Sequence, residues 1–276
     1  MVSRLEIYDL ATGARRVVLE TERLIEAPNW GPDCLADGAF LLVTAEGRLW
    51  RVPLDRPELV PFETGFADRC NNDHGFSPDG KWLALSCHRG RGSEVFLVGA
   101  GGGVPRLLLP DAPSWFHGWF PDGSRIVYAA ARGGRTVDIY SAAADGSDER
   151  RLTFGEGHSD GPDVSADGAW VYYNSDRGGH AQIWRVRPDG TGHEQVFEDG
   201  RVNWFPHPSP DGRSVLYLSY PPGTEGHPRD LPVSLWLMDP DGGDRREVVT
   251  LTGGQGTMNV PNWRKDGRAF AFVSYG

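Results

Sequence analysis

The chain has few cysteines, no long hydrophobic run and no excess of basic residues. Its three cysteines, Cys34, Cys70 and Cys87, are odd in number and show no Cys-x-x-Cys spacing, which argues against a disulfide framework or a zinc knuckle. No stretch approaches ~18 consecutive apolar residues, so no transmembrane helix and no membrane insertion are expected. The first residues lack a basic segment followed by an apolar run, so no secretory signal is predicted. These absences favour a cytoplasmic protein; a periplasmic one would require a leader that has already been removed.

The charge balance is acidic, with 28 Lys and Arg against 38 Asp and Glu and a formal net charge of −10. Such a balance argues against general nucleic-acid binding, which needs a basic footprint. Charged residues at 24% and aromatic residues at 11% are typical of a packed globular protein. The 37 glycines and 21 prolines are too many for a helical protein, because both residues interrupt helices. The composition therefore predicts many turns between short elements.

One signature recurs along the chain: a Pro-Asp-Gly or related turn followed by an apolar run. The copies occupy residues 76–80, 120–123, 164–168, 208–212 and 263–267, and a degenerate copy begins at Trp30 and continues through Asp37 and Gly38. Asp-Gly between apolar runs is a strong β-hairpin signal, because Gly tolerates a positive φ and Asp bonds its own backbone. Each copy therefore predicts a hairpin.

A second signature, a short strand with paired apolar and aromatic residues, follows each first signature except the last. Its copies are at 49–50, 95–96, 139–140, 183–184 and 235–236, and a sixth copy, at 7–8, opens the chain. The chain thus begins with a second hairpin and ends with a first. Closing the repeats into a ring joins these ends in one blade. The sequence predicts an all-β, six-bladed β-propeller of four-stranded antiparallel blades, about 46 residues each. Residues 1–276 would form a single domain, and residues 1–20 would complete the C-terminal blade.

The runs 76–86 and 164–190 resemble the Pro-Asp-40 repeat of TolB-like β-propellers. The resemblance covers nearly the whole chain and implies six blades, but it includes no counterpart of the TolB N-terminal domain and does not imply TolB's role. Similar repeats occur in propellers of prolyl-oligopeptidase-type peptidases and of oligogalacturonate lyases. The peptidases need a Gly-x-Ser-x-Gly elbow, and no such pentapeptide occurs here.

Polar side chains precede five of the six turn signatures, where each innermost strand would begin at the rim of the central funnel. Loops between blades lie on the face opposite the Asp-Gly turns, to which only a structural role is assigned. An insertion in the fifth blade, residues 220–230, is long enough to fold over this rim. The candidate ligand-binding residues are Asn72, Asp73, His74, His117, His158, Asp160, Asn203, Trp204, His207, His227, Arg229, Gln255 and Asn259. Alternatively, such side chains bond only water or neighbouring main chain. His88, His180 and His193 are expected to be solvated.

Two functions of different class remain open. The first is a binding module whose His- and Arg-rich funnel face holds a small anionic ligand, an oligosaccharide or a protein or peptide segment, without catalysis. The second is an enzyme resembling oligogalacturonate lyases, with a divalent metal on His74, His158 and His207, and with Gln255 as a further ligand. In that case Arg177 or Arg229 would hold a uronate carboxylate. Whether the chain is an enzyme is therefore uncertain from sequence.

Overall fold

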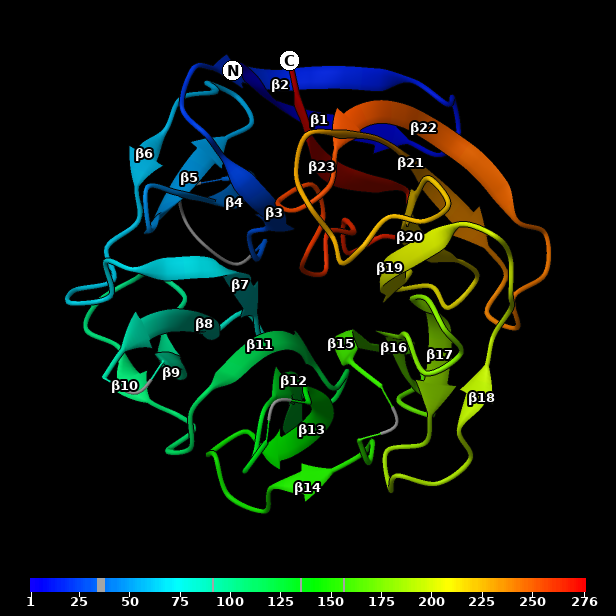
Figure 1. Cartoon of the computed structure of the whole chain (residues 1–276). Helices are drawn as coiled ribbons and strands as arrows, with labels where there is room; N and C mark the ends of the chain where they lie inside the picture. The colour runs from blue at the N-terminus through cyan, green and yellow to red at the C-terminus, as the bar shows by residue number, and fades with distance from the viewer. Residues whose placement is uncertain (34–37, 91, 135, 156) are drawn as a thin grey trace.

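The strands form six sheets arranged in a ring (Figure 1). The structure is a computed structural model that describes residues 1–33, 38–90, 92–134, 136–155 and 157–276. Cys34 and Asp37 lie outside these residues. The described residues form no helix, and hence none long and apolar enough to cross a membrane.

Five sheets have four antiparallel strands each, and their innermost strand comes first in the chain. Blades 1 and 2 comprise β3 (Glu26–Trp30), β4 (Phe40–Ala45), β5 (Arg48–Pro53), β6 (Val60–Pro61), β7 (Cys70–Phe76), β8 (Trp82–Arg89), β9 (Gly92–Gly99) and β10 (Arg106–Leu107). Blades 3 and 4 comprise β11 (Ser114–Trp119), β12 (Arg125–Ala130), β13 (Asp138–Ala143), β14 (Arg150–Arg151), β15 (Ser159–Val164), β16 (Val171–Ser175), β17 (Gln182–Val186) and β18 (Glu194–Gln195). Blade 5 comprises β19 (Val202–Pro208), β20 (Val215–Tyr220), β21 (Leu231–Met238) and β22 (Arg246–Gly253).

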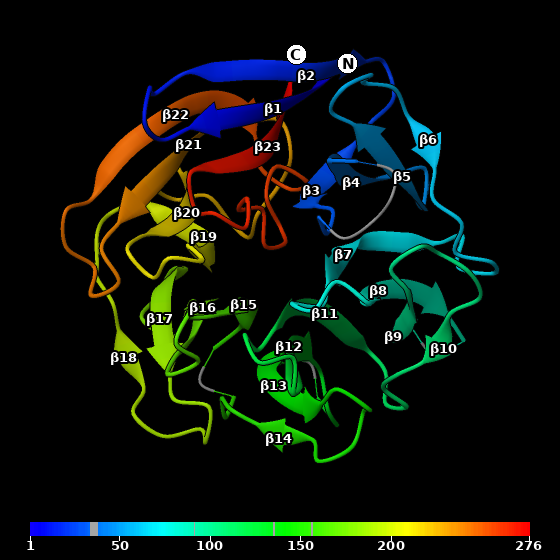
Figure 2. The same cartoon turned by 180° about the vertical axis from the view of Figure 1, so that it is seen from behind.

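Blade 6 is closed by strands from both ends of the chain, as predicted. β1 (Ser3–Asp9) pairs antiparallel with β23 (Ala269–Tyr275), and β2 (Arg15–Thr21) completes the sheet. The segment inside β23 joins it through a single bridge, between Trp263 and Phe270. The N- and C-termini lie side by side in Figures 1 and 2. The chain begins with a second hairpin and ends with a first hairpin because these two hairpins pair in blade 6 and close the ring.

The Asp-Gly turns have the conformation that their sequence predicts. Gly80 and Gly123 both have a φ of 70°, a left-handed conformation that glycine adopts without a steric penalty. The Asp79 carboxylate accepts hydrogen bonds from the Ser77 hydroxyl at 2.7 Å and from the Lys81 amide at 3.1 Å. These local contacts fix each hairpin independently of the rest of the ring.

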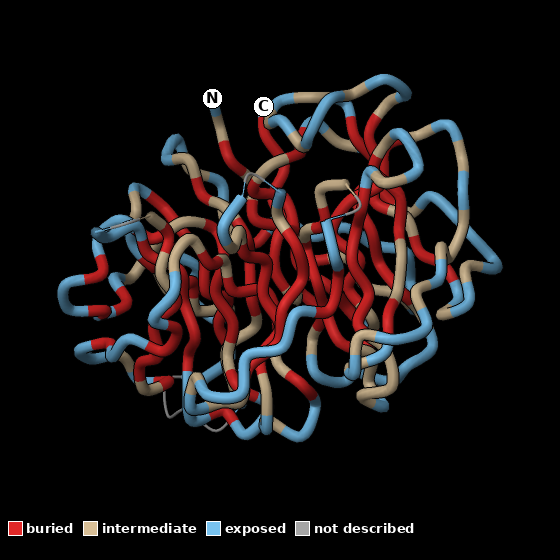
Figure 3. Tube along the Cα trace, turned by 60° about the horizontal axis from the view of Figure 1, so that its bottom comes forward, coloured by how far each residue is buried: buried red, intermediate tan, exposed pale blue. Residues whose placement is uncertain are grey.

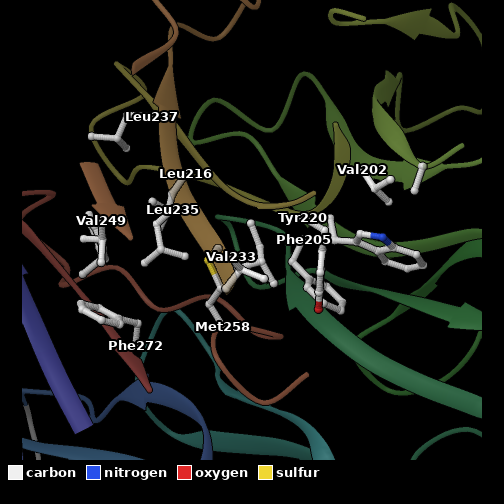
Figure 4. Close-up of a cluster of buried hydrophobic side chains, with 14 of the residues drawn as sticks. Val202, Phe205, Leu216, Tyr220, Val233, Leu235, Leu237, Val249, Met258 and Phe272 are labelled. Carbon is white, nitrogen blue, oxygen red and sulfur yellow. The ribbon is translucent and has the colours of Figure 1, made fainter. Parts of the chain in front are cut away.

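The hydrophobic core lies mainly between blades. Six clusters of buried side chains each join two neighbouring blades, and the one between blades 5 and 6 also includes Ala181 of blade 4; in another, Val127 and Ile139 of blade 3 pack with Val171 and Tyr173 of blade 4. Figure 4 shows the cluster between blades 5 and 6, where Leu216 and Leu235 approach Met258 and Phe272. Buried segments fill the middle of the disc, and exposed ones lie in its loops (Figure 3). Each sheet thus depends on both neighbours.

Tryptophans beside the turn signature connect adjacent blades through hydrogen bonds. The indole Nε1 of Trp119 in blade 3 donates to the Gly75 carbonyl of blade 2 at 3.0 Å. The indole of Trp263 in blade 6 donates to the His207 carbonyl of blade 5 at 2.8 Å. A recurrent sequence position therefore has a recurrent role between blades.

A β-bulge interrupts each of the five innermost strands β3, β7, β11, β15 and β19. In β7 the pairing passes from Cys70 opposite Cys87 to His74 opposite Leu85, so residues 71–73 leave the ladder. In β19 it passes from Trp204 opposite Leu218 to His207 opposite Leu216, and Phe205 has a φ of 53°. Because bulges redirect side chains, they decide which residues face the funnel.

Candidate functional site

A cavity of about 310 Å³ opens at the funnel mouth, where the innermost strands begin. It combines residues from blades 2 to 5 with the segment that leads into blade 6. Bulge residues supply much of its wall, including Asn72 and Asp73 from β7 and Phe205 from β19. The full lining is Asn71, Asn72, Asp73, His88, Trp115, His117, Val137, His158, Asp160, Phe205, His227, Gln255 and Asn259.

Three imidazoles surround the Asp160 carboxylate. The Nε2 atoms of His117, His158 and His227 lie 3.2, 3.7 and 4.0 Å from its oxygens. Burial opposes ionisation of Asp160, but hydrogen bonding and charge from His117 and His158 hold its pKa well below the usual value. Asp160 is therefore an anion enclosed by imidazole groups.

His117 is the buried cation that matches this anion. Its Nδ1 lies 3.3 Å from the main-chain oxygen of Asn259, which can only accept, so Nδ1 carries a hydrogen. Its Nε2 faces the ionised Asp160 and donates to it. Burial opposes this charge, but Asp160 and Asp73 together raise the pKa of His117 above its usual value. Asp160 likewise raises the pKa of His158, whose side chain is more exposed.

His227 behaves differently, although it also lines the cavity. Its Nδ1 lies 2.5 Å from Oε1 of Gln255 and therefore donates to that oxygen, which also accepts from the Asn259 amide at 3.0 Å. Burial lowers the pKa of His227. Its Nε2 is 4.0 Å from Asp160, beyond hydrogen-bond distance, and keeps a lone pair. The insertion thus brings a neutral imidazole to the funnel.

Asp73 is the one lining carboxylate without an ion pair among the described residues. Its residue is only 7% exposed. Burial raises the pKa of Asp73 to about 7; the charge of His117 opposes this, while the charges of Asp160 and Glu26 add to it. A carboxylate in this position gains from a proton or from a cation supplied by a ligand.

Five of the expected site residues lie outside the cavity lining. His74 is fully buried, 3.3 Å from the Thr44 hydroxyl, and burial lowers its pKa to about 4. Asn203 is buried and donates to Gln182 at 3.1 Å.

His207 uses both ring nitrogens within the protein, with Nδ1 3.0 Å from Asp163 and Nε2 2.8 Å from the Met258 carbonyl. Arg229 is ion-paired with Glu26, which also accepts from Asn72. Trp204 is buried, and its ring centroid lies 4.4 Å from that of His227. Trp204 therefore packs against the lining residue His227 without lining the cavity itself.

The expected metal ligands do not meet. His158 lies at the cavity, whereas His74 and His207 resume the strand ladder beyond the bulges of β7 and β19. Over the described ranges, no group of three or more His, Cys, Asp or Glu side chains is placed to hold a metal ion. Arg177, expected as an anion ligand, lies over the Trp184 ring at 4.7 Å.

Several lining residues were not predicted. His88, expected to be merely solvated, is exposed but lies on the cavity wall, and Trp115 and Phe205 add aromatic surface. The other two histidines expected to be solvated are half-buried and bonded: His180 donates to the Asp199 carbonyl at 2.9 Å, and His193 lies 3.2 Å from the Tyr173 hydroxyl. The only sequence signal for Trp115 and Phe205 was that they lie in the runs 115–117 and 203–207, beside residues that were already candidates.

The fold and repeats define a six-bladed β-propeller of TolB-type repeats. A family model described as the TolB beta propeller domain, PD40, matches residues 109–229. The chain is 49% identical over 279 residues to an uncharacterized protein of Agrobacterium fabrum, covering 100% of this chain and 93% of that protein. The chain belongs to the TolB-like β-propeller family.

Solved structures agree with this assignment. A TolB-like protein from Agrobacterium tumefaciens has a TM-score of 0.96 at 48% identity, with 100% of this chain and 99% of that chain covered. An oligogalacturonate lyase in complex with manganese has a TM-score of 0.58 at 14% identity, with 96% of this chain and 76% of that chain covered. At that identity the similarity is one of fold alone.

Proposed function

We propose that the chain is a binding propeller whose funnel cavity receives the free amino group of a peptide segment. The observation that carries this proposal is the Asp73 carboxylate, which lines the cavity, is 7% exposed and has no ion pair among the described residues. A protonated amine placed there supplies the missing charge and returns Asp73 to its ionised form.

The rest of the lining suits the groups beside a peptide amine. Asn71 and Asn72 directly precede Asp73, and Gln255 and Asn259 also line the cavity, so four side-chain amides are available to bond the main chain of a peptide. Trp115 and Phe205 offer apolar surface for a side chain. His227 contributes a lone pair on Nε2 that can accept from a ligand donor.

The two alternatives from sequence have less support. An anionic ligand would need a free cation, but Arg229 is neutralised by Glu26 and the charge of His117 faces Asp160. A metal-dependent uronide lyase would need a set of ligands that the described residues do not assemble. Catalysis is therefore not part of the proposal.

The test is calorimetric titration with a tripeptide bearing a free amino terminus and with its N-acetylated form. The free peptide should bind and the acetylated one should bind at least about tenfold more weakly, because the buried carboxylate then lacks its cation. Asp73→Asn should remove this preference. Asp55→Asn is the matched control, since Asp55 is exposed and is not among the lining residues.

Equal binding of the two peptides, or an unchanged preference in Asp73→Asn, would contradict the proposal. Tighter binding of a trigalacturonate would favour the anionic alternative. A stoichiometric divalent metal in protein purified without chelator, lost in His158→Ala, would favour the enzyme.

A further inference from the structure

A second and larger cavity lies at the other end of the funnel, among the turns to which the sequence assigned only a structural role. Its volume is about 600 Å³, and all six blades contribute to its wall. We propose that it is a second ligand site, for a zwitterionic aromatic molecule of the size of an aromatic amino acid. This proposal does not depend on the one made for the funnel mouth.

The wall is rigid and apolar. Six prolines line it: Pro32, Pro78, Pro121, Pro208, Pro210 and Pro261. Proline has a fixed φ and no amide hydrogen, so such a wall offers carbon surface and few donors. Flat apolar groups are the natural occupants of a concave site of this kind.

The aromatic residues of the wall have already used their polar atoms. The Trp30 indole donates to the Asn262 carbonyl at 2.9 Å, and the Trp263 indole donates to the His207 carbonyl at 2.8 Å. What remains for a ligand is ring surface, together with that of Phe76. Ring-on-ring contact adds to simple burial, which favours an aromatic occupant over an aliphatic one.

Most of the charged side chains in the lining are matched within the protein. Arg264 is paired with Asp266 at 2.8 Å, and Asp79 with Lys81 at 3.0 Å. The Asp163 carboxylate lies 3.0 Å from His207. These charged groups therefore do not require a counter-charge from a ligand.

Two lining charges have no ion pair among the described residues: the carboxylate of Asp33 and the ammonium of Lys265. Both are exposed, and they come from adjacent blades, 1 and 6, which the Trp30 indole already joins. Opposite free charges beside one apolar cavity match a ligand with a carboxylate, an ammonium and an aromatic body. A free aromatic α-amino acid has these three parts.

The experiment uses L-tryptophan and two analogues that each lack one charge: indole-3-propionate, without the amine, and tryptamine, without the carboxylate. Calorimetry with the whole chain should show tryptophan binding best. Lys265→Gln should weaken tryptophan and indole-3-propionate by about threefold to tenfold and leave tryptamine unchanged. Asp33→Asn should weaken tryptophan and tryptamine by a similar factor and leave indole-3-propionate unchanged.

Controls separate the cavity from the general charge of this face. Arg213→Gln removes an exposed cation from the turn of blade 5, outside the lining, and should leave all three affinities unchanged. Ala166→Trp places a large side chain at a lining turn position that is proline in four other copies, and should weaken the binding of all three compounds by occupying part of the cavity.

No binding of tryptophan up to about 5 mM would overturn the proposal. So would equal effects of Lys265→Gln and Arg213→Gln, or full affinity in Ala166→Trp at unchanged thermal stability. Equal affinity for all three compounds would show that the site binds apolar rings without selecting for charge. It would overturn the proposal that the ligand is zwitterionic.

Discussion

His117 connects three parts of the ring through its two ring nitrogens. On β11, its Nε2 lies 3.2 Å from Oδ1 of Asp160 on β15, and its Nδ1 lies 3.3 Å from the carbonyl of Asn259, in the segment leading to β23. A single imidazolium thus connects the innermost segments of blades 3, 4 and 6, and its removal should lower the stability of the protein.

Replacing His117 by Gln should destabilise the protein by up to about 3–5 kcal/mol near pH 6, because the buried Asp160 anion loses its closest cation and keeps only the more exposed His158, at 3.7 Å. The contribution of His117, whose folded pKa is raised, is present below its usual value of 6.5 and lost as pH rises through the folded value. That of Asp160, whose folded pKa is lowered, is present above 3.8 and lost as pH falls through the folded value.

The difference in unfolding free energy between wild type and His117→Gln should therefore be largest between these limits. Urea titrations from pH 4 to pH 8 measure it. A difference independent of pH would show that the loss is one of packing and not of charge.

Asp73 should act on stability in the opposite sense. Its folded pKa, about 7, is raised above the usual 3.8, so the folded state holds a proton that the unfolded state releases, and stability falls as pH rises between these values. Asp73→Asn should remove this loss and stabilise the protein by about 1–3 kcal/mol at pH 8, with little effect at pH 4. Thermal midpoints at the two pH values test this, with Asp55→Asn as control.

The Trp119 hydrogen bond to Gly75 should stabilise the interface between blades 2 and 3. Trp119→Phe keeps a ring but leaves the Gly75 carbonyl unpaired, and should cost about 1–2 kcal/mol. Trp82→Phe is the control, since Trp82 is 43% exposed, and should change stability by less than about 0.5 kcal/mol. Equal urea midpoints for the two variants would exclude this role for the indole.

Deleting residues 1–20 should remove β1 and β2 and expose the edge of β23, so the protein should lose cooperative unfolding or aggregate. The control is a circular permutant that joins Gly276 to Met1 and opens the exposed loop between Gly178 and Gly179. The Val2 amide already bonds to the Gly276 carbonyl at 2.7 Å, so a short linker suffices. Wild-type stability of the truncated chain would contradict the closure described above.

Cys70 and Cys87 are free, buried and directly opposite each other on β7 and β8. Facing strand positions are close enough for a disulfide, and a hydrogen bond with the Cys70 thiol lowers the pKa of Cys87. In a Cys34→Ser background, diamide should convert the two thiols to one disulfide, seen as the loss of two hydrogens by mass spectrometry. Cys70→Ser should show no such loss. Persistent free thiols after oxidation would exclude the pairing.

The fold could be predicted from sequence because its signals are local. Each Asp-Gly turn satisfies itself through contacts such as Asp79 with Ser77 and Lys81, and the recurrence of the turns gives the number of blades. The offset between the hairpins at 7–8 and 263–267 then predicts closure.

The site could be predicted only in part, because bulges decide which side chains face the funnel. His74 follows Asp73 directly, but it resumes the ladder opposite Leu85, whereas Asp73 remains in the bulge and lines the cavity. His207 is displaced in the same way in β19. A strict two-residue alternation does not hold across a bulge, and one sequence does not show where the bulge falls.

Because of the six inter-blade clusters, every blade of the ring packs against two neighbours. In an open row of repeats the end units have one neighbour and fray first. Here every blade has two, since the strands of the N-terminus fill the place beside β23. A blade can separate from the ring only when both of its interfaces are broken, because a blade that has lost one interface is still held by the other. We therefore expect no progressive fraying from an end of the chain. The ring should unfold cooperatively, beginning only when two interfaces between blades are lost at the same time.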